Sequence, residues 1–158
     1  MGKIYDELKQ AKRFAQPQQE AAVALMRTAD VLRARVEAAL LPHGISPEQY
    51  NVLRILRGAP DHRLPTLEIA SRMIARAPNI TRLIDKLVQK SLVSRCDHDR
   101  DRRIVVVKLS SKGLDLVSAA TPMVDELDTR AFDGLTRAQV DTLIQLLDAV
   151  RTPGTPPG

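Results

Sequence analysis

The sequence predicts a mainly α-helical fold with one small β-hairpin, a mixed α+β class, as a single domain over residues 1–158. Apolar residues recur at steps of three and four before residue 58 and after residue 110, which is the period of an amphipathic helix. Two β-prone runs, "LVSRC" and "RIVVVKL", border the polar stretch 96–103, "CDHDRDRR", as strands border a hairpin loop. An apolar content of 44% in 158 residues is enough for one core.

The N-terminal arm, residues 17–45, is expected to form one long helix that ends at Pro42 and Gly44. Its apolar stripe consists of Leu25, Ala29, Leu32, Val36 and Leu40. Such a stripe needs a partner surface to cover it.

Two further helices have the start signal known as a capping box, in which a hydroxyl residue precedes a Gln by three positions. The first box is formed by Ser46 and Gln49, and its helix is expected to end at Gly58. The second box is formed by Thr136 and Gln139.

The C-terminal arm, residues 110–151, is expected to contain two helices, the first starting at Ser110. The proline at position 122 is expected to kink or break this first helix. The faces expected to be buried carry Leu114, Val117, Val124, Leu127 and Ala131 in the first helix and Val140, Leu143, Leu147 and Val150 in the second. Residues 152–158, "TPGTPPG", are expected to be disordered.

The segment "TLEIASRMIARAPNITRLIDKLVQK" predicts two short helices with Thr66 capping the first, an interruption near Arg76 and Ala77, and Pro78 in the first turn of the second. The second helix has an apolar face of Ile80, Leu83, Ile84, Leu87 and Val88. Two short helices joined by a tight turn indicate a helix-turn-helix. Because the hairpin follows directly, residues 46–109 are interpreted as a winged helix-turn-helix lobe in which the hairpin loop is the wing.

The opposite face of the second helix is polar and cationic, which suits entry into a DNA major groove: Arg and Lys donate to guanine, Asn pairs with adenine, and all reach phosphates. The candidate contact residues on or near this face are Arg76, Asn79, Thr81, Arg82, Lys86 and Gln89. The alternative is an ordinary amphipathic helix with a solvated face.

The wing candidates for DNA contact are Arg100, Asp101, Arg102 and Arg103. Arginines at the tip suit the minor groove, where the negative potential is strongest over A·T-rich sequence. An aspartate two residues away in the hairpin can orient a guanidinium, so Asp101 is assigned to Arg103. The alternative is a solvated turn with surface ion pairs worth ~0–1 kcal/mol each.

No metal site and no cofactor is expected. Asp97, Asp99 and Asp101 alternate as in a calcium loop, but that motif needs Gly at its sixth position and Glu at its twelfth, and this segment has Arg and Lys there. Cys96 and His98 are an isolated pair without further ligand spacing, which is more typical of surface residues.

The net charge of +5 is unevenly distributed. Residues 63–112 contain twelve Lys and Arg against five Asp and Glu, whereas the rest of the chain contains twelve against fourteen. A basic centre between near-neutral arms indicates a polyanionic partner, with a solvated basic face as the alternative.

Several function classes are disfavoured. There is no nucleophile-base pair or Gly-rich phosphate loop, so an enzyme is not expected. There is no apolar run near twenty residues and the N-terminus is charged, so no membrane span or signal peptide is expected, and we expect a cytoplasmic, nucleoid-associated protein. Aromatic residues make up only 3%, too few for the stacking surfaces of single-strand binders.

The segment "DRRIVVVKLSSKG" resembles the wing signature of the MarR family of bacterial winged-helix regulators, through Asp101, Arg103, Val107, Leu109, Ser110 and Gly113. "ISPEQYNVLRIL" and "IASRMIARAPNITRLIDKLVQKSLVSR" are also similar to that family, so the resemblance covers residues 20–150. One departure is Ser91, where the family usually has Gly after the recognition helix; a left-handed cap there would be strained.

The resemblance implies a homodimer in which residues 17–45 and 110–151 interlock, binding to pseudo-palindromic double-stranded DNA, and repression relieved by a small aromatic or phenolic ligand. It also places a ligand pocket near His43, Tyr50, Asn51 and Arg54, where Arg54 is a candidate partner for a carboxylate. Each of these four residues has a capping, surface or core role as its alternative. Two other functions stay open: a winged-helix protein-interaction module, and a redox-sensing regulator that uses Cys96.

Overall fold

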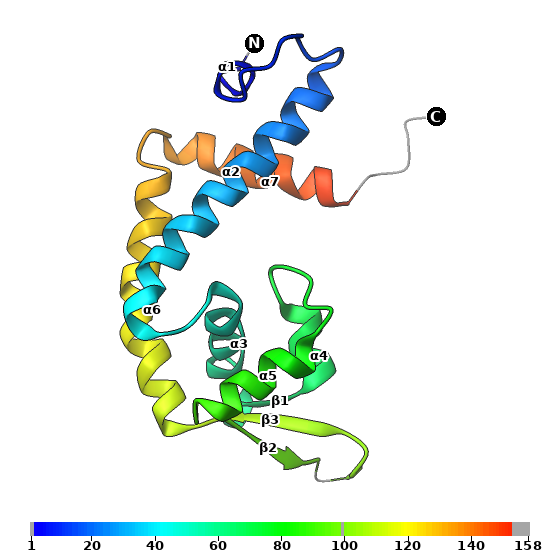
Figure 1. Ribbon diagram of the computed structural model, residues 1–158, viewed down its shortest axis with the longest axis vertical. Coiled ribbons are helices and arrows are strands. Elements are labelled where there is room, and N and C mark those ends of the chain that lie inside the picture. The colour runs from blue at the N-terminus through cyan, green and yellow to red at the C-terminus, as the bar shows by residue number, and fades with distance from the viewer. Residues whose placement is uncertain (1, 99, 153–158) are drawn as a thin grey trace.

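The computed structural model describes residues 2–98 and 100–152 and arranges them as a helical arm above a lobe of helices and strands (Figure 1). The arm contains α1 (Ile4–Glu7), α2 (Pro17–Leu40), α6 (Ser111–Ala131) and α7 (Arg137–Arg151). The tail expected to be disordered spans residues 152–158. All of it except Thr152 lies outside the described residues. Among the described residues, none of the helices combines the length and apolar character that a membrane span requires.

The lobe contains α3 (Pro47–Arg57), α4 (Thr66–Arg72), α5 (Ile80–Gln89) and the strands β1 (Arg63–Pro65), β2 (Val93–Asp97) and β3 (Val105–Leu109). The strands form an antiparallel sheet in the order β1-β3-β2, and short 3-10 helices span Leu41–His43 and Pro60–His62. The predicted fold class is therefore confirmed. β1 was not foreseen, because it has only three residues and one of them is proline, which strands disfavour.

The core lies in the lobe and is closed by the lower parts of α2 and α6. Its fully buried side chains include Leu40, Val52, Leu53, Leu56, Ile69, Ile84, Leu87, Val107 and Val117. The inner face of α5 matches the predicted stripe: Ile84 and Leu87 are fully buried, and its other apolar residues pack against them half-buried. Burial of this face turns the opposite face of α5 to solvent.

The predicted capping boxes are confirmed. In α3, the backbone N–H of Gln49 donates to the Ser46 hydroxyl at 3.2 Å, and the N–H of Ser46 donates to the Gln49 side chain at 3.1 Å. Thr136 and Gln139 make the same pair of bonds at the start of α7. Ser110 caps α6 by accepting from the N–H of Gly113 at 2.9 Å.

Two expectations about helix ends are wrong. Thr66 does not cap α4; it is the first helical residue, and its hydroxyl donates to the carbonyl of Val105 in β3 at 3.1 Å. Pro78 lies outside α5, because the first helical bond of α5 is accepted by the carbonyl of Asn79.

The break considered at Pro122 does not occur, since α6 continues from Ser111 to Ala131. Proline removes one helical hydrogen bond, but α6 packs against both α2 and α3, and this packing offsets the loss. The hydroxyl of Thr121, just before the proline, donates to the carbonyl of Val117 at 2.6 Å and adds a bond at this point.

Ser91 does adopt the left-handed conformation, with φ of 60°. Its N–H donates to the carbonyl of Val88, and the N–H of Leu92 donates to that of Leu87. The chain thus turns sharply from α5 into β2 at a residue other than glycine, which stores some backbone strain.

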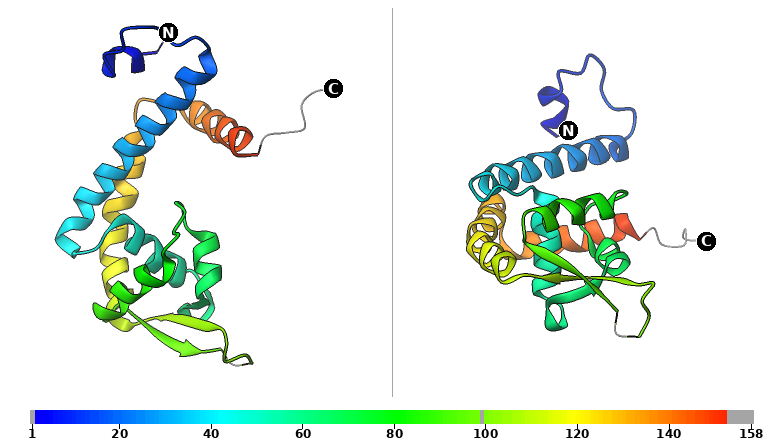
Figure 2. Two further views of the ribbon diagram at one scale, coloured as in Figure 1. Left: turned by 45° about the vertical axis from the view of Figure 1, so that its right-hand side comes forward. Right: turned by 60° about the horizontal axis from the view of Figure 1, so that its bottom comes forward.

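The apolar stripes of the arm are only partly covered within one chain: Leu40, Val117 and Val124 are buried, whereas the predicted face of α7 is half-buried at Val140, Leu143 and Leu147 and exposed at Val150. No residue of α7 is buried, and Ile144, Leu146 and Val150 are 52%, 60% and 66% exposed. The left view of Figure 2 shows α7 turning back from the top of α6 and passing above the lobe. In α2, Met26 is likewise 64% exposed.

Candidate nucleic-acid interface

The outward face of α5 carries most of the residues predicted to contact DNA. Five candidates lie on α5 or at its N-cap, and all are exposed: Asn79, Thr81, Arg82, Lys86 and Gln89. The sixth, Arg76, is exposed in the linker of residues 73–79 between α4 and α5. The fold therefore places five of the six on α5 or at its N-cap, and the sixth in the linker that precedes the helix.

The cations of this face are available to an anionic partner. Within the described residues, Arg76, Arg82 and Lys86 form no ion pair with an acidic side chain. The one acidic residue of α5, Asp85, is bonded instead to Arg95 of β2. The face thus combines free positive charge with hydrogen-bonding groups that can read base edges.

The wing loop holds Arg103 against Asp101. The guanidinium donates from Nε to Asp101 Oδ1 at 3.1 Å and from Nη2 to Oδ2 at 2.9 Å, and the backbone N–H of Arg103 also donates to Oδ1 at 2.9 Å. The Arg103 side chain nevertheless stays 91% exposed. Asp101 is therefore placed to orient an arginine that remains accessible to a ligand.

The hydrogen bonds from Arg103 lower the pKa of Asp101 below its ordinary value. A lowered pKa means that Asp101 is ionised and bonded to Arg103 at neutral pH. The bonded form is lost only as the pH falls through that lowered pKa.

His98 also shapes the wing, a role that the sequence did not indicate. Its Nδ1 accepts from the backbone N–H groups of Arg100 and Asp101, each at 3.2 Å, which holds the turn at these two residues. The sequence pattern that could have predicted this role is a polar side chain two or three residues before the backbone N–H groups of a turn, which is the spacing of side chains that accept hydrogen bonds in turns. Arg100 and Arg102 are exposed.

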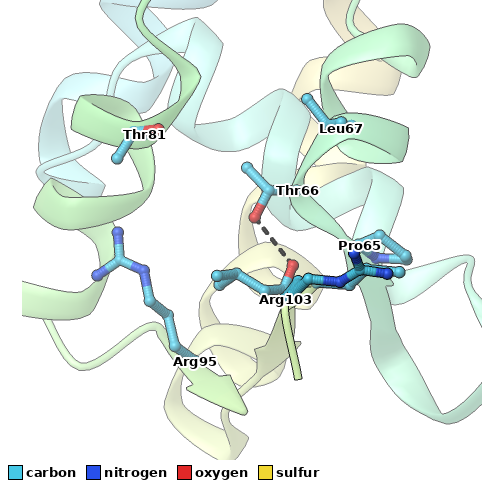
Figure 3. A pocket seen from close by; sticks show the side chains of 8 residues that line it. Pro65, Thr66, Leu67, Thr81, Arg95 and Arg103 are labelled. Atoms are coloured by element: carbon cyan, nitrogen blue, oxygen red, sulfur yellow. Dashed lines mark hydrogen bonds between the residues drawn. The ribbon is translucent and has the colours of Figure 1, made fainter. Parts of the chain in front are cut away.

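A groove of about 420 Å³ lies between α4, α5 and the wing (Figure 3). It is lined by Pro65, Thr66, Leu67, Thr81, Arg95, Arg103, Ile104 and Val105. Figure 3 shows the Arg95 guanidinium extending from β2 toward the helix that carries Thr81. Arg95 was not predicted as a contact residue. Because side chains alternate along a strand, Arg95 lies on the same sheet face as the buried Val93. This alternation is the sequence pattern that could have placed Arg95 toward the lobe.

A second cavity, of about 540 Å³, opens between the arm and the lobe. Tyr50, Asn51 and Arg54 line it, as the resemblance implied, together with parts of α2 and α6 and linker residues 73–75. His43 is not among the lining residues; it ends the short helix Leu41–His43, before the turn at Gly44. The structure therefore brings three of the four predicted residues together.

The polar groups of this cavity are largely engaged with one another. The hydroxyl of Tyr50 donates to that of Thr121 at 3.2 Å, and the Arg54 guanidinium lies 5.9 Å from the centre of the Tyr50 ring. Burial raises the pKa of Asp128, another lining residue, and the positive charge of Arg54 opposes that rise. Arg33, on the same wall, is bonded to Glu48 at 2.7 Å. Each cavity arginine therefore already has a carboxylate within electrostatic reach.

Cys96 is half-buried on β2, and its Sγ lies 3.7 Å from the Val106 carbonyl, to which the thiol donates. In the part of the chain that the structure describes, no group of three or more His, Cys, Asp or Glu could hold a metal ion.

Comparison with known proteins identifies the family. The model of the MarR family matches residues 45–105, which run from the start of α3 to the start of β3. The uncharacterised HTH-type transcriptional regulator YkoM of Bacillus subtilis (strain 168) is 32% identical over 105 residues, 66% of this chain and 67% of that protein. The chain belongs to the MarR family.

Solved MarR-family structures extend the match to the arms. A MarR transcription factor from Planctomyces limnophilus is 37% identical with a TM-score of 0.64, covering 86% of this chain and 98% of that one. A mutant MarR from E. coli, complexed with operator DNA, is 26% identical with a TM-score of 0.73, covering 80% of this chain and 90% of that one. MarR-family regulators are DNA-binding proteins rather than enzymes, and dimerisation and release by ligands are typical of them.

Proposed function

We propose that this chain is a cytoplasmic, nucleoid-associated homodimer that represses transcription by binding a pseudo-palindromic operator and releases it when a small aromatic or phenolic ligand binds. The observation that carries the proposal is that the recognition helix and the wing share one surface: Thr81 of α5 and Arg103 of the wing line the same groove. On this surface α5 enters the major groove, and the wing arginine reaches the adjacent minor groove.

The dimer is supported by the uncovered apolar surface of the arm. Exposed side chains of α2 and α7, such as Met26 and Leu146, are left uncovered by the described residues of one chain, and a second copy would bury them. Two lobes joined in this way read half-sites about 34 Å apart, one turn of the double helix.

The ligand site is supported by the cavity between arm and lobe. Its volume of about 540 Å³ lies within the range of small-molecule pockets, which is roughly 300–1,000 Å³. Because arm and lobe both line it, a ligand there can change the position of the lobes relative to the dimer axis.

Arg82→Ala is expected to weaken operator binding by about 1–3 kcal/mol if Arg82 reads a base. The loss should be larger for the specific duplex than for a random duplex of the same length, as measured by fluorescence anisotropy at fixed salt. Arg27→Ala is the matched control, because Arg27 is exposed on α2, away from the lobe. Full retention of specific binding by the Arg82 variant would remove α5 as the reading helix.

Asp101→Asn is expected to weaken operator binding and to reduce the preference for A·T-rich flanks, because Arg103 loses a charged orienting partner. If Asp101 had no orienting role, removing its negative charge near DNA would strengthen operator binding. The direction of the change in affinity therefore distinguishes the two cases. Asp97→Asn is the control, an exposed acid of the same hairpin. A gain in affinity for both variants, with flank preference intact, would show that Asp101 has no orienting role.

A further inference from the structure

The linker of residues 73–79 forms a wall of the ligand cavity and also leads into the recognition helix. Met73, Ile74 and Ala75 line the cavity. The linker contains no helix or strand, and α5 begins directly after it at Ile80. Figure 1 shows this green segment rising from the end of α4 toward the arm. A molecule in the cavity therefore contacts the backbone that positions α5.

One hydrogen bond ties this linker to α3. The backbone N–H of Ile74 donates to Oδ1 of Asn51 at 2.8 Å. Within the described residues, no other hydrogen bond joins residues 74–78 to another element. The Ile74 side chain is 90% exposed, so its burial does not anchor the linker. Met73 packs against the core at the start of the linker, and beyond it the Asn51 side chain supplies the hydrogen bond that holds residues 74–78; this side chain also lines the cavity.

We propose that Asn51 is the positioning residue that couples the cavity to α5, and that a ligand acts on it through a hydroxyl group that donates to its amide oxygen. In the free protein, Oδ1 of Asn51 holds the Ile74 N–H and keeps the start of α5 in its DNA-binding position. A ligand hydroxyl that donates to the same oxygen draws the amide group toward the cavity and weakens the bond to Ile74. The linker and α5 then shift together.

This inference rests on the proposed function and deepens it, because it specifies how ligand binding reaches the DNA-contacting helix. Coupling of this kind requires a contact that both sites influence, and the Asn51–Ile74 bond is such a contact. On the same wall, the Arg33 guanidinium is already bonded to Glu48 at 2.7 Å and is not a free partner for a ligand carboxylate.

The first test follows the Ile74 amide by hydrogen exchange in the full-length protein without DNA. We expect Asn51→Leu to speed exchange of the Ile74 amide at least tenfold, because the acceptor is removed. Asn51→Asp keeps an acceptor oxygen and should restore the protection. The amide of Arg76, in the same linker, is the internal control and should be unchanged in all three proteins.

The second test uses two matched probes, 1-naphthol and 1-methoxynaphthalene, which differ in the hydroxyl hydrogen. We expect both to bind the wild-type protein, as followed by their intrinsic fluorescence. Saturating 1-naphthol should raise the operator Kd about tenfold, within the usual range of allosteric coupling, and should speed Ile74 exchange; the ether should change the Kd less than twofold. In Asn51→Leu the operator Kd should start severalfold higher and not respond further to 1-naphthol.

Unchanged Ile74 exchange in Asn51→Leu would overturn the proposal, and so would equal effects of naphthol and ether on the operator Kd. Failure of both probes to bind at millimolar concentration would overturn the ligand assignment. Hydrogen exchange of the Ile74 amide in the wild-type protein, with and without 1-naphthol, needs neither DNA nor a variant. Its outcome therefore tests the coupling separately from the proposed function. The proposed function itself fails if the wild-type protein binds no operator duplex.

Discussion

Gly113→Ala is expected to lower the free energy of unfolding by about 2–3 kcal/mol, at the upper end of the cost of overpacking. A Cβ at this position would lie 2.1 Å from the carbonyl oxygen of Leu92 and 2.9 Å from Cδ1 of Leu109. The first of these is a backbone atom at the start of the hairpin and cannot rotate away. The helix propensity gained by alanine, about 1 kcal/mol, offsets only part of this cost. Urea unfolding followed by circular dichroism measures the difference.

Gly134→Ala is the matched control for this prediction. A Cβ at Gly134 meets no atom within 4 Å, and the residue lies in the turn between α6 and α7. Its stability should be unchanged or slightly higher, since alanine restricts the unfolded chain. Equal stability of the two variants would mean that α6 does not approach the hairpin as closely as described.

Leu146→Arg is expected to convert the dimer to a monomer and to raise the operator Kd by at least 100-fold. Leu146 is 60% exposed in the single chain and lies beside Leu143 on the apolar side of α7. A charge placed there must be buried without a partner if the dimer forms. Loss of the dimer removes the second half-site contact, and linked sites gain about 10²–10⁴ over single ones. Sedimentation velocity and fluorescence anisotropy give the two readouts.

Gln145→Arg controls for the added charge, because Gln145 is exposed on the polar side of the same helix. It should remain dimeric and bind the operator at least as well as the wild type. A dimeric Leu146→Arg protein with unchanged operator binding would place the interface elsewhere on the arm. Far-ultraviolet circular dichroism should show the same helix content in all three proteins.

Features whose partners lie close together in the chain could be predicted well. The capping boxes at Ser46 and Thr136 join residues three apart, and the inner face of α5 follows from helical period. The contact between Asp101 and Arg103 spans two residues. In each case local geometry alone brings the groups together, so the pattern is visible in the sequence.

Features that join distant segments could not be predicted. The Asn51–Ile74 bond spans 23 residues, and Arg95 meets Asp85 across the turn from α5 to β2. The role of Thr66 was misread because a free hydroxyl before a helix resembles a cap, whereas pairing of β1 with β3 gave this hydroxyl a different acceptor.

The sequence by itself determined the order of the helices, the hairpin, the cationic outer face of α5 and the orienting pair of the wing. Local backbone preferences and helical or strand periodicity are sufficient for these features. Only the tertiary structure decided which of the expected ligand residues share a cavity, since it includes Asn51 and leaves out His43. It also decided that Gly113 must lack a side chain, because that requirement comes from the distance to the Leu92 carbonyl, a separation set by packing of α6 against the lobe.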